Sequence, residues 1–122
     1  MQELTDERFQ QLIDNALGEL PQKSLDHLKN VAILFEDEPT PDQRVKLDLS
    51  PDQSLYGLYE GVPLPFRQGQ SPTLPDRITL FKLPILGSSD DEAALKEQIK
   101  HTLWHEVAHY YGLNHDRIHE LE

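Results

Sequence analysis

The feature that most constrains this chain is a long helical segment close to its C-terminus. Residues 90–111 contain neither proline nor glycine, and Gly112 follows them as a plausible C-terminal cap. Ser89, with Glu92 three residues later, forms a capping-box signature at the other end. Because this helix takes up so much of a 122-residue chain, the other elements have to pack around it, and we expect one domain spanning residues 1–122.

The N-terminal segment also has a helical pattern. Thr5 is a suitable N-cap, and Asp6 and Glu7 suit the positive end of a helix dipole. Pro21 marks the end of this segment, and a short second helix is expected over residues 24–29. The apolar residues recur at helical spacing and predict one buried face, made of Phe9, Leu12, Ile13, Ala16, Leu17 and Leu20.

Short strands are predicted between the two helical regions. The intervening residues 37–54 are rich in aspartate and proline, and residues 61–76 contain four prolines; both compositions are typical of loops. A final short helix is expected over residues 116–121. The predicted strands cover residues 31–35, 54–60 and 77–83. The pattern therefore predicts an α+β fold, with a small mixed sheet of about three strands covered by helices and the site-bearing helix near the C-terminus.

The charge and the cysteine content exclude several classes of protein. The chain has 22 acidic and 11 basic residues, a formal net charge of -11, which repels the phosphates of nucleic acid. It has no cysteine, so disulfides and thiolate metal sites are excluded. We expect a cytoplasmic protein without a membrane partner, because the acidic N-terminus does not resemble a signal peptide and no apolar run has the length of a membrane span.

The long helix carries the motif His-Glu-x-x-His at residues 105–109. Residues four apart on a helix are offset by about 40° around the axis and roughly 6 Å along it, so His105 and His109 can bind one ion together. Glu106 flanks that ion and can contact a water bound to it without being a ligand. The opposite side of the helix is predicted to pack on the sheet through Leu103, Trp104, Val107 and Ala108, and the polar stripe continues with Gln98, His101 and Thr102.

Gly112 and His115 extend the motif to HExxHxxGxxH. A left-handed Gly112 would end the helix and allow His115 to return as a third ligand. Three protein ligands and a water are the pattern of catalytic zinc, whereas structural zinc has four. Asp116 and Glu120 are alternative third ligands, and the alternative to a metal site is a pair of exposed histidines with Gly112 only as a cap.

The stretch from His105 to His115 resembles the extended motif of the metzincins, and the chain as a whole resembles the minimal zincin-like metallopeptidases, which are small bacterial proteins. The resemblance covers residues 55–64, 75–81 and 102–113, of which only the last is a specific motif. True metzincins also need a methionine turn after the third histidine, and here the only methionine is Met1. The resemblance implies zinc as the cofactor, and either a peptide-binding edge strand or an ordinary strand at residues 77–83.

Two functions from different classes fit these observations. The first is a zinc-dependent metallopeptidase that hydrolyses peptide bonds through a zinc-activated water, with Glu106 as general base and a peptide or protein as substrate. The second is a zinc-binding interaction module with little or no hydrolase activity, and a vestigial site is a third reading. An ordered wall at residues 61–76 would favour the enzyme, and a plug over the metal would favour the module. The sequence leaves open the substrate, the oligomeric state and the second oxyanion donor, for which Tyr56, Tyr59, Tyr110 and Tyr111 are candidates.

Overall fold

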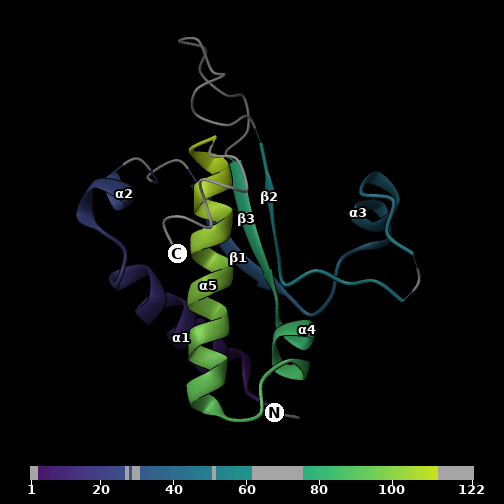
Figure 1. The fold of residues 1–122 in the computed structure, drawn as a ribbon, viewed down its shortest axis with the longest axis horizontal. Helices are drawn as coiled ribbons and strands as arrows, with labels where there is room; N and C mark the ends of the chain where they lie inside the picture. The colour runs from purple at the N-terminus through teal and green to yellow at the C-terminus, as the bar shows by residue number, and fades with distance from the viewer. Residues whose placement is uncertain (1–2, 27, 29–30, 51, 62–75, 113–122) are drawn as a thin grey trace.

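The structure is a computed structural model that describes residues 3–26, 28, 31–50, 52–61 and 76–112. It confirms the predicted α+β fold, in which helices pack on a small mixed sheet (Figure 1). The elements follow the order α1 (Asp6–Gly18), α2 (Gln22–Asp26), β1 (Val31–Glu36), α3 (Pro41–Lys46), β2 (Gly57–Glu60), β3 (Asp76–Phe81), α4 (Lys82–Gly87) and α5 (Glu92–Tyr110).

The sheet has the strand order β1-β3-β2. β1 runs parallel to β3 with Ile33 opposite Ile78, and β2 runs antiparallel to β3 with Leu58 opposite Thr79. β3 is therefore paired on both sides, so of the two alternatives for residues 77–83 the peptide-binding edge is wrong and the ordinary sheet strand is confirmed. Its central place agrees with its burial: Ile78, Leu80 and Phe81 of β3 are fully buried, whereas most residues of β1 and all of β2 are only half-buried. Among the described strands, β1 and β2 form the edges.

The hydrophobic core lies between the sheet, α1 and α5. α5 crosses in front of the sheet, with α1 and α2 to one side of it and β2 to the other (Figure 1). Leu95, Ile99 and Leu103 follow one another at four-residue spacing on α5 and are completely buried. Phe9 of α1 meets Phe35 of β1 edge-on, with ring centroids 5.0 Å apart. The predicted apolar face of α1 is thus confirmed as core. Of the residues predicted to pack from α5, Leu103 and Val107 are buried, whereas Trp104 and Ala108 are half-buried.

The ends of the two long helices show one confirmed and one wrong prediction. Thr5 caps α1 and accepts a hydrogen bond from the backbone N–H of Arg8. α5 is capped by Asp91, whose side chain accepts from Ala94 N at 2.8 Å. The predicted cap, Ser89, is buried instead and its hydroxyl donates to Ile85 O at 2.9 Å. Asp91 takes this role because Ser89 is already used to close the turn after α4.

α5 ends as the sequence predicts. Its last residue is Tyr110, and Gly112 has a φ of 77°, in the left-handed region that favours glycine. The short helix expected over residues 116–121 lies outside the described part of the chain, as do residues 62–75 of the predicted loop. Within the described part, no helix is both long and apolar enough to cross a bilayer.

Two short helices were not predicted: α3 lies in a predicted loop, and α4 begins within the end of a predicted strand. α3 occupies part of the region expected to be loop, and it is set apart from the other elements, beyond β2 (Figure 1). Thr40 and Gln43 form a complete capping box there, a signal that the sequence contains. α4 begins where the strand 77–83 was expected to continue. Pro84 lies in the first turn of α4, and because proline has no N–H to donate it does not suit a continued strand. Lys82, at the start of α4, is buried and forms an ion pair with Asp6 at 2.7 Å.

Candidate metal centre

The two histidines of the motif face each other on successive turns of α5. Their Nε2 atoms lie 3.1 Å apart and their ring centroids 4.7 Å apart. Two nitrogens that share one tetrahedral zinc at about 2.0–2.1 Å are separated by roughly 3.3 Å. The side chains of His105 and His109 are thus already arranged closely enough to fit a single ion of this kind.

Glu106 completes the cluster. One ligand atom from each of His105, Glu106 and His109 lies within 4.8 Å of the others. The histidines are half-buried, whereas the Glu106 side chain is buried, with 7% of its surface exposed. The carboxylate therefore lies on the inner side of the site, beside the histidine nitrogens and shielded from bulk water.

Burial has a clear effect on the carboxylic acid. Loss of hydration raises the pKa of Glu106 to about 7, and a hydrogen bond from the backbone N–H of Tyr59 acts in the opposite direction by stabilising the carboxylate. A cation held by the histidines would lower this pKa further. A carboxyl group whose pKa lies near neutrality is suited to accept and return a proton.

An open cavity of about 260 Å³ lies directly beside the cluster. It runs along α5 toward its N-terminus, and Gln98 Nε2 donates to Thr102 Oγ1 at 3.0 Å along its floor. The predicted polar stripe of the helix is thereby confirmed as one wall of this cavity. The lining residues come from α5 and from the segment that enters β2: Leu55, Tyr56, Gly57, Gln98, His101, Thr102, His105 and Glu106.

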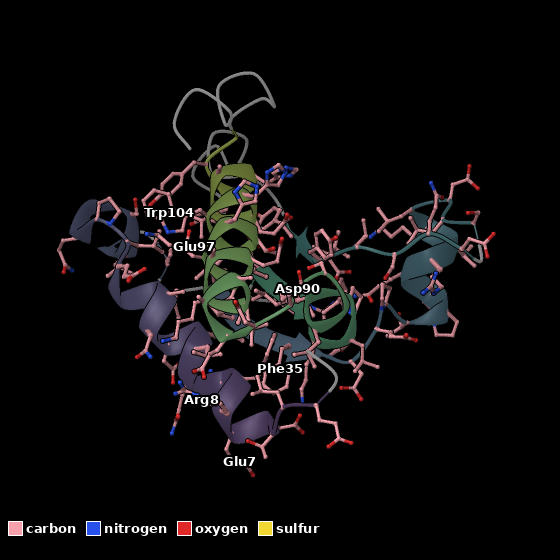
Figure 2. All side chains as sticks on the ribbon, turned by 60° about the horizontal axis from the view of Figure 1, so that its bottom comes forward. Glu7, Arg8, Phe35, Asp90, Glu97 and Trp104 are labelled. Carbon is pink, nitrogen blue, oxygen red and sulfur yellow. The ribbon has the colours of Figure 1, made fainter. Side chains whose placement is uncertain are left out.

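The opposite side of α5 has a different character. Trp104 projects toward the side on which α1 and α2 lie in Figure 2, and it is not among the residues that line the cavity. Leu103 and Val107 are buried, as predicted, and Trp104 packs against the core while remaining partly exposed. A larger cavity, of about 690 Å³, lies between the start of α1 and α4, and none of the described residues that line it is a histidine.

Strand β2 is the part of the site that sequence reasoning missed. A Cβ atom on Gly57 would lie 2.7 Å from Thr102 Cγ2 and 3.3 Å from Glu106 Cγ, so the strand approaches α5 more closely than any other residue there would allow. The ring of Tyr59 packs on that of Tyr110, with centroids 5.8 Å apart. The sequence signal was the glycine inside an otherwise strand-like segment, which indicates a close backbone approach.

The predicted site residues fall into two groups. The structure brings His105, Glu106 and His109 together, whereas His115 and its alternatives Asp116 and Glu120 lie outside the described residues. Of the tyrosines considered as oxyanion donors, Tyr56 lines the cavity. Tyr59 donates to Asp76 and Tyr111 to the carbonyl of Ser24, so both hydroxyls have other partners.

Fold and site together define an α+β protein with a His-Glu-His cluster on its last described helix. Residues 28–122 match the family described as Zincin-like metallopeptidase, and the chain belongs to that family. The fold is similar to that of a conserved hypothetical protein from Thermus thermophilus, with a TM-score of 0.61. The two sequences are 23% identical, and the match covers 88% of this chain and 94% of the other, which shows a shared fold. No curated protein matches the sequence.

Proposed function

We propose that this protein is a zinc-dependent metallopeptidase in which His105 and His109 hold the metal and Glu106 is the general base. The observation that carries the proposal is the distance of 3.1 Å between the two Nε2 atoms, with the buried Glu106 carboxylate beside them. Family membership supports the same class of chemistry. The proposed third ligand is His115, with Asp116 and Glu120 as the alternatives.

Each residue of the cluster has a distinct role in this proposal. Zinc, when bound, supplies a Lewis acid that acidifies water and stabilises an oxyanion. Glu106 accepts a proton from the attacking water and delivers it to the nitrogen of the leaving amine. Its burial keeps bulk water away from this proton, and the bond from Tyr59 N–H holds the carboxylate against β2.

The proposed substrate is an extended peptide or a protein segment. β2 lies at an edge of the described sheet and contacts α5 at the site, so a peptide could align along it and reach Glu106. The net charge of -11 disfavours nucleic acid as a partner. A cytoplasmic location stays an expectation from the sequence.

The alternative is a zinc-binding module without hydrolase activity. The segment expected to distinguish the two, residues 61–76, lies mostly outside the described part. The cavity beside Glu106 favours the enzyme, because it gives a substrate side chain room next to the general base.

Metal content and hydrolysis, measured on the same protein samples, test the proposal. Zinc-loaded and dialysed wild type should retain one zinc per chain by elemental analysis, and His109→Ala should lose it. Glu106→Gln should keep the zinc and lose at least about a hundred-fold in hydrolysis of a quenched-fluorescence peptide library, as expected for loss of a general base. Zinc binding without hydrolysis by the wild type would support the module, and hydrolysis by Glu106→Gln at the wild-type rate would refute the mechanism.

A further inference from the structure

We propose that Tyr59 and Asp76 form a clasp that holds β2 against α5 and thereby positions Glu106. This inference rests on the proposed function, because it assigns Tyr59 as a positioning residue for the general base. Three contacts of one residue carry it: the backbone N–H of Tyr59 binds the Glu106 carboxylate, its ring packs on Tyr110, and its hydroxyl donates to Asp76.

The sheet register explains why the backbone of Tyr59 is available to Glu106. Phe81 N donates to Tyr56 O at 2.8 Å, which makes these two residues a hydrogen-bonded pair. Pairs alternate along antiparallel strands, so Leu58 and Glu60 are bonded to β3 while the N–H and C=O groups of Gly57 and Tyr59 point away from it. An N–H at this position needs a partner from outside the sheet, and the Glu106 carboxylate provides it.

The side chain of Tyr59 connects the same strand to two other elements. Its ring contacts Tyr110, one helical turn after Glu106 on α5. Its hydroxyl donates to the carboxylate of Asp76, the first residue of β3, which is only 3% exposed. Backbone and side chain of one residue thus tie β2 to α5 and to the centre of the sheet.

The backbone after β2 is shaped around Asp76. Gly61 has a φ of 149°, and a Cβ atom there would lie 2.3 Å from Asp76 Cγ. The Asp76 carboxylate therefore occupies the space that a side chain at position 61 would need. β2 has only four residues, and the described sheet supports it on one side, so its distance from α5 depends on such contacts.

Substitution at both ends of the clasp tests it in the metal-free and the zinc-loaded protein. Tyr59→Phe keeps the ring but loses the bond to Asp76, and we expect amide hydrogen exchange at residue 59 to become roughly ten-fold faster in the metal-free protein. Asp76→Asn keeps an acceptor for the hydroxyl and should retain slow exchange. In the zinc-loaded protein, Tyr59→Phe should lower kcat by about ten-fold with KM and zinc content unchanged, since the base is displaced while the metal ligands stay.

Tyr111→Phe is the matched control. It removes another half-buried tyrosine hydroxyl, which donates to Ser24 O at 2.7 Å, and should leave exchange at residue 59 at the wild-type rate. Unchanged exchange in Tyr59→Phe would overturn the clasp, and faster exchange with an unchanged kcat would overturn its role in positioning. A wild type that binds zinc but hydrolyses nothing would refute the proposed function alone, because exchange in the metal-free protein still decides whether Tyr59 holds Glu106.

Discussion

At the scale of single residues, the site depends on how differently three neighbouring side chains are buried. His105 and His109 stay half-exposed, so a metal ion can reach their nitrogens. Glu106 lies on the next position around the helix and turns inward, where β2 covers it. A helix with exposed histidines alone would bind metal, but it would lack a shielded base. The close cover of β2 thus supplies the shielded carboxyl group that the proposed catalytic role of Glu106 requires.

The buried carboxyl group predicts a pH-dependent stability for the metal-free protein. Because the pKa of Glu106 is raised from 4.5 to about 7 on folding, its contribution favours folding below pH 4.5 and is lost as the pH rises through 7. Glu106→Gln removes this loss. Urea unfolding in the presence of a chelator should show the variant gaining up to about 3 kcal/mol on the wild type between pH 4.5 and pH 8. A stability difference that does not change with pH would contradict the burial of an ionisable Glu106.

At the scale of elements, the contact between β2 and α5 is close and depends on a missing side chain. Gly57 lies against Thr102 and Glu106, and Tyr59 lies against Tyr110, so the strand follows one stripe of the helix. Gly57, Thr102 and Glu106 of this contact also line the cavity beside His105. The position of β2 therefore sets both the cover over Glu106 and the entrance to the site.

A double-mutant cycle tests this contact. Gly57→Ala should lower the free energy of unfolding by about 1–3 kcal/mol, because the new Cβ would lie 2.7 Å from Thr102 Cγ2 and force the strand away from the helix. Thr102→Ser removes that methyl group, so the double variant should lose less than the sum of the single variants, as measured by urea unfolding. Additive losses would mean that the strain arises elsewhere.

At the scale of the whole molecule, the core holds together a chain with a strong excess of negative charge. Ion pairs join α1 to α5 through Arg8 with Glu92 and through Glu19 with Lys100, but all four side chains are more than a third exposed and contribute little. The packing of α1, α5 and β3 supplies the main support. A bound cation would add to the stability of this core, because its ligands His105 and His109 lie on α5, the longest described helix of the core.

Zinc should accordingly stabilise the entire fold. Free zinc at a hundred times its Kd should raise the free energy of unfolding by about 2.7 kcal/mol, since only the folded chain presents both histidines together. Thermal unfolding of zinc-loaded and chelated wild type measures this as a shift in Tm. His109→Ala serves as the control, and an equal shift in that variant would place the zinc at another site.

Local pattern was sufficient for much of the fold and for the centre of the site. The spacing of His105, Glu106 and His109 determines how they are placed around a helix, and the apolar positions of α1 determine which of its faces is buried, since both follow from helical periodicity. The buried face of α5 also contains Thr102 and Glu106, which its apolar pattern does not indicate. Gly112 ends the helix because glycine, without a side chain, adopts the left-handed backbone conformation at little steric cost. α3 was also encoded locally, by its capping box, although the prolines around it indicated a loop.

Only the tertiary structure decided the features that depend on partners distant in sequence. The strand order puts β3 at the centre of the described sheet and β2 at an edge, where β2 lies against Glu106. The burial of Glu106, and with it the pKa of about 7, arises from a strand nearly fifty residues away. A helix pattern fixes the directions in which side chains point, but the solvent that each side chain loses depends on what the rest of the chain packs against it.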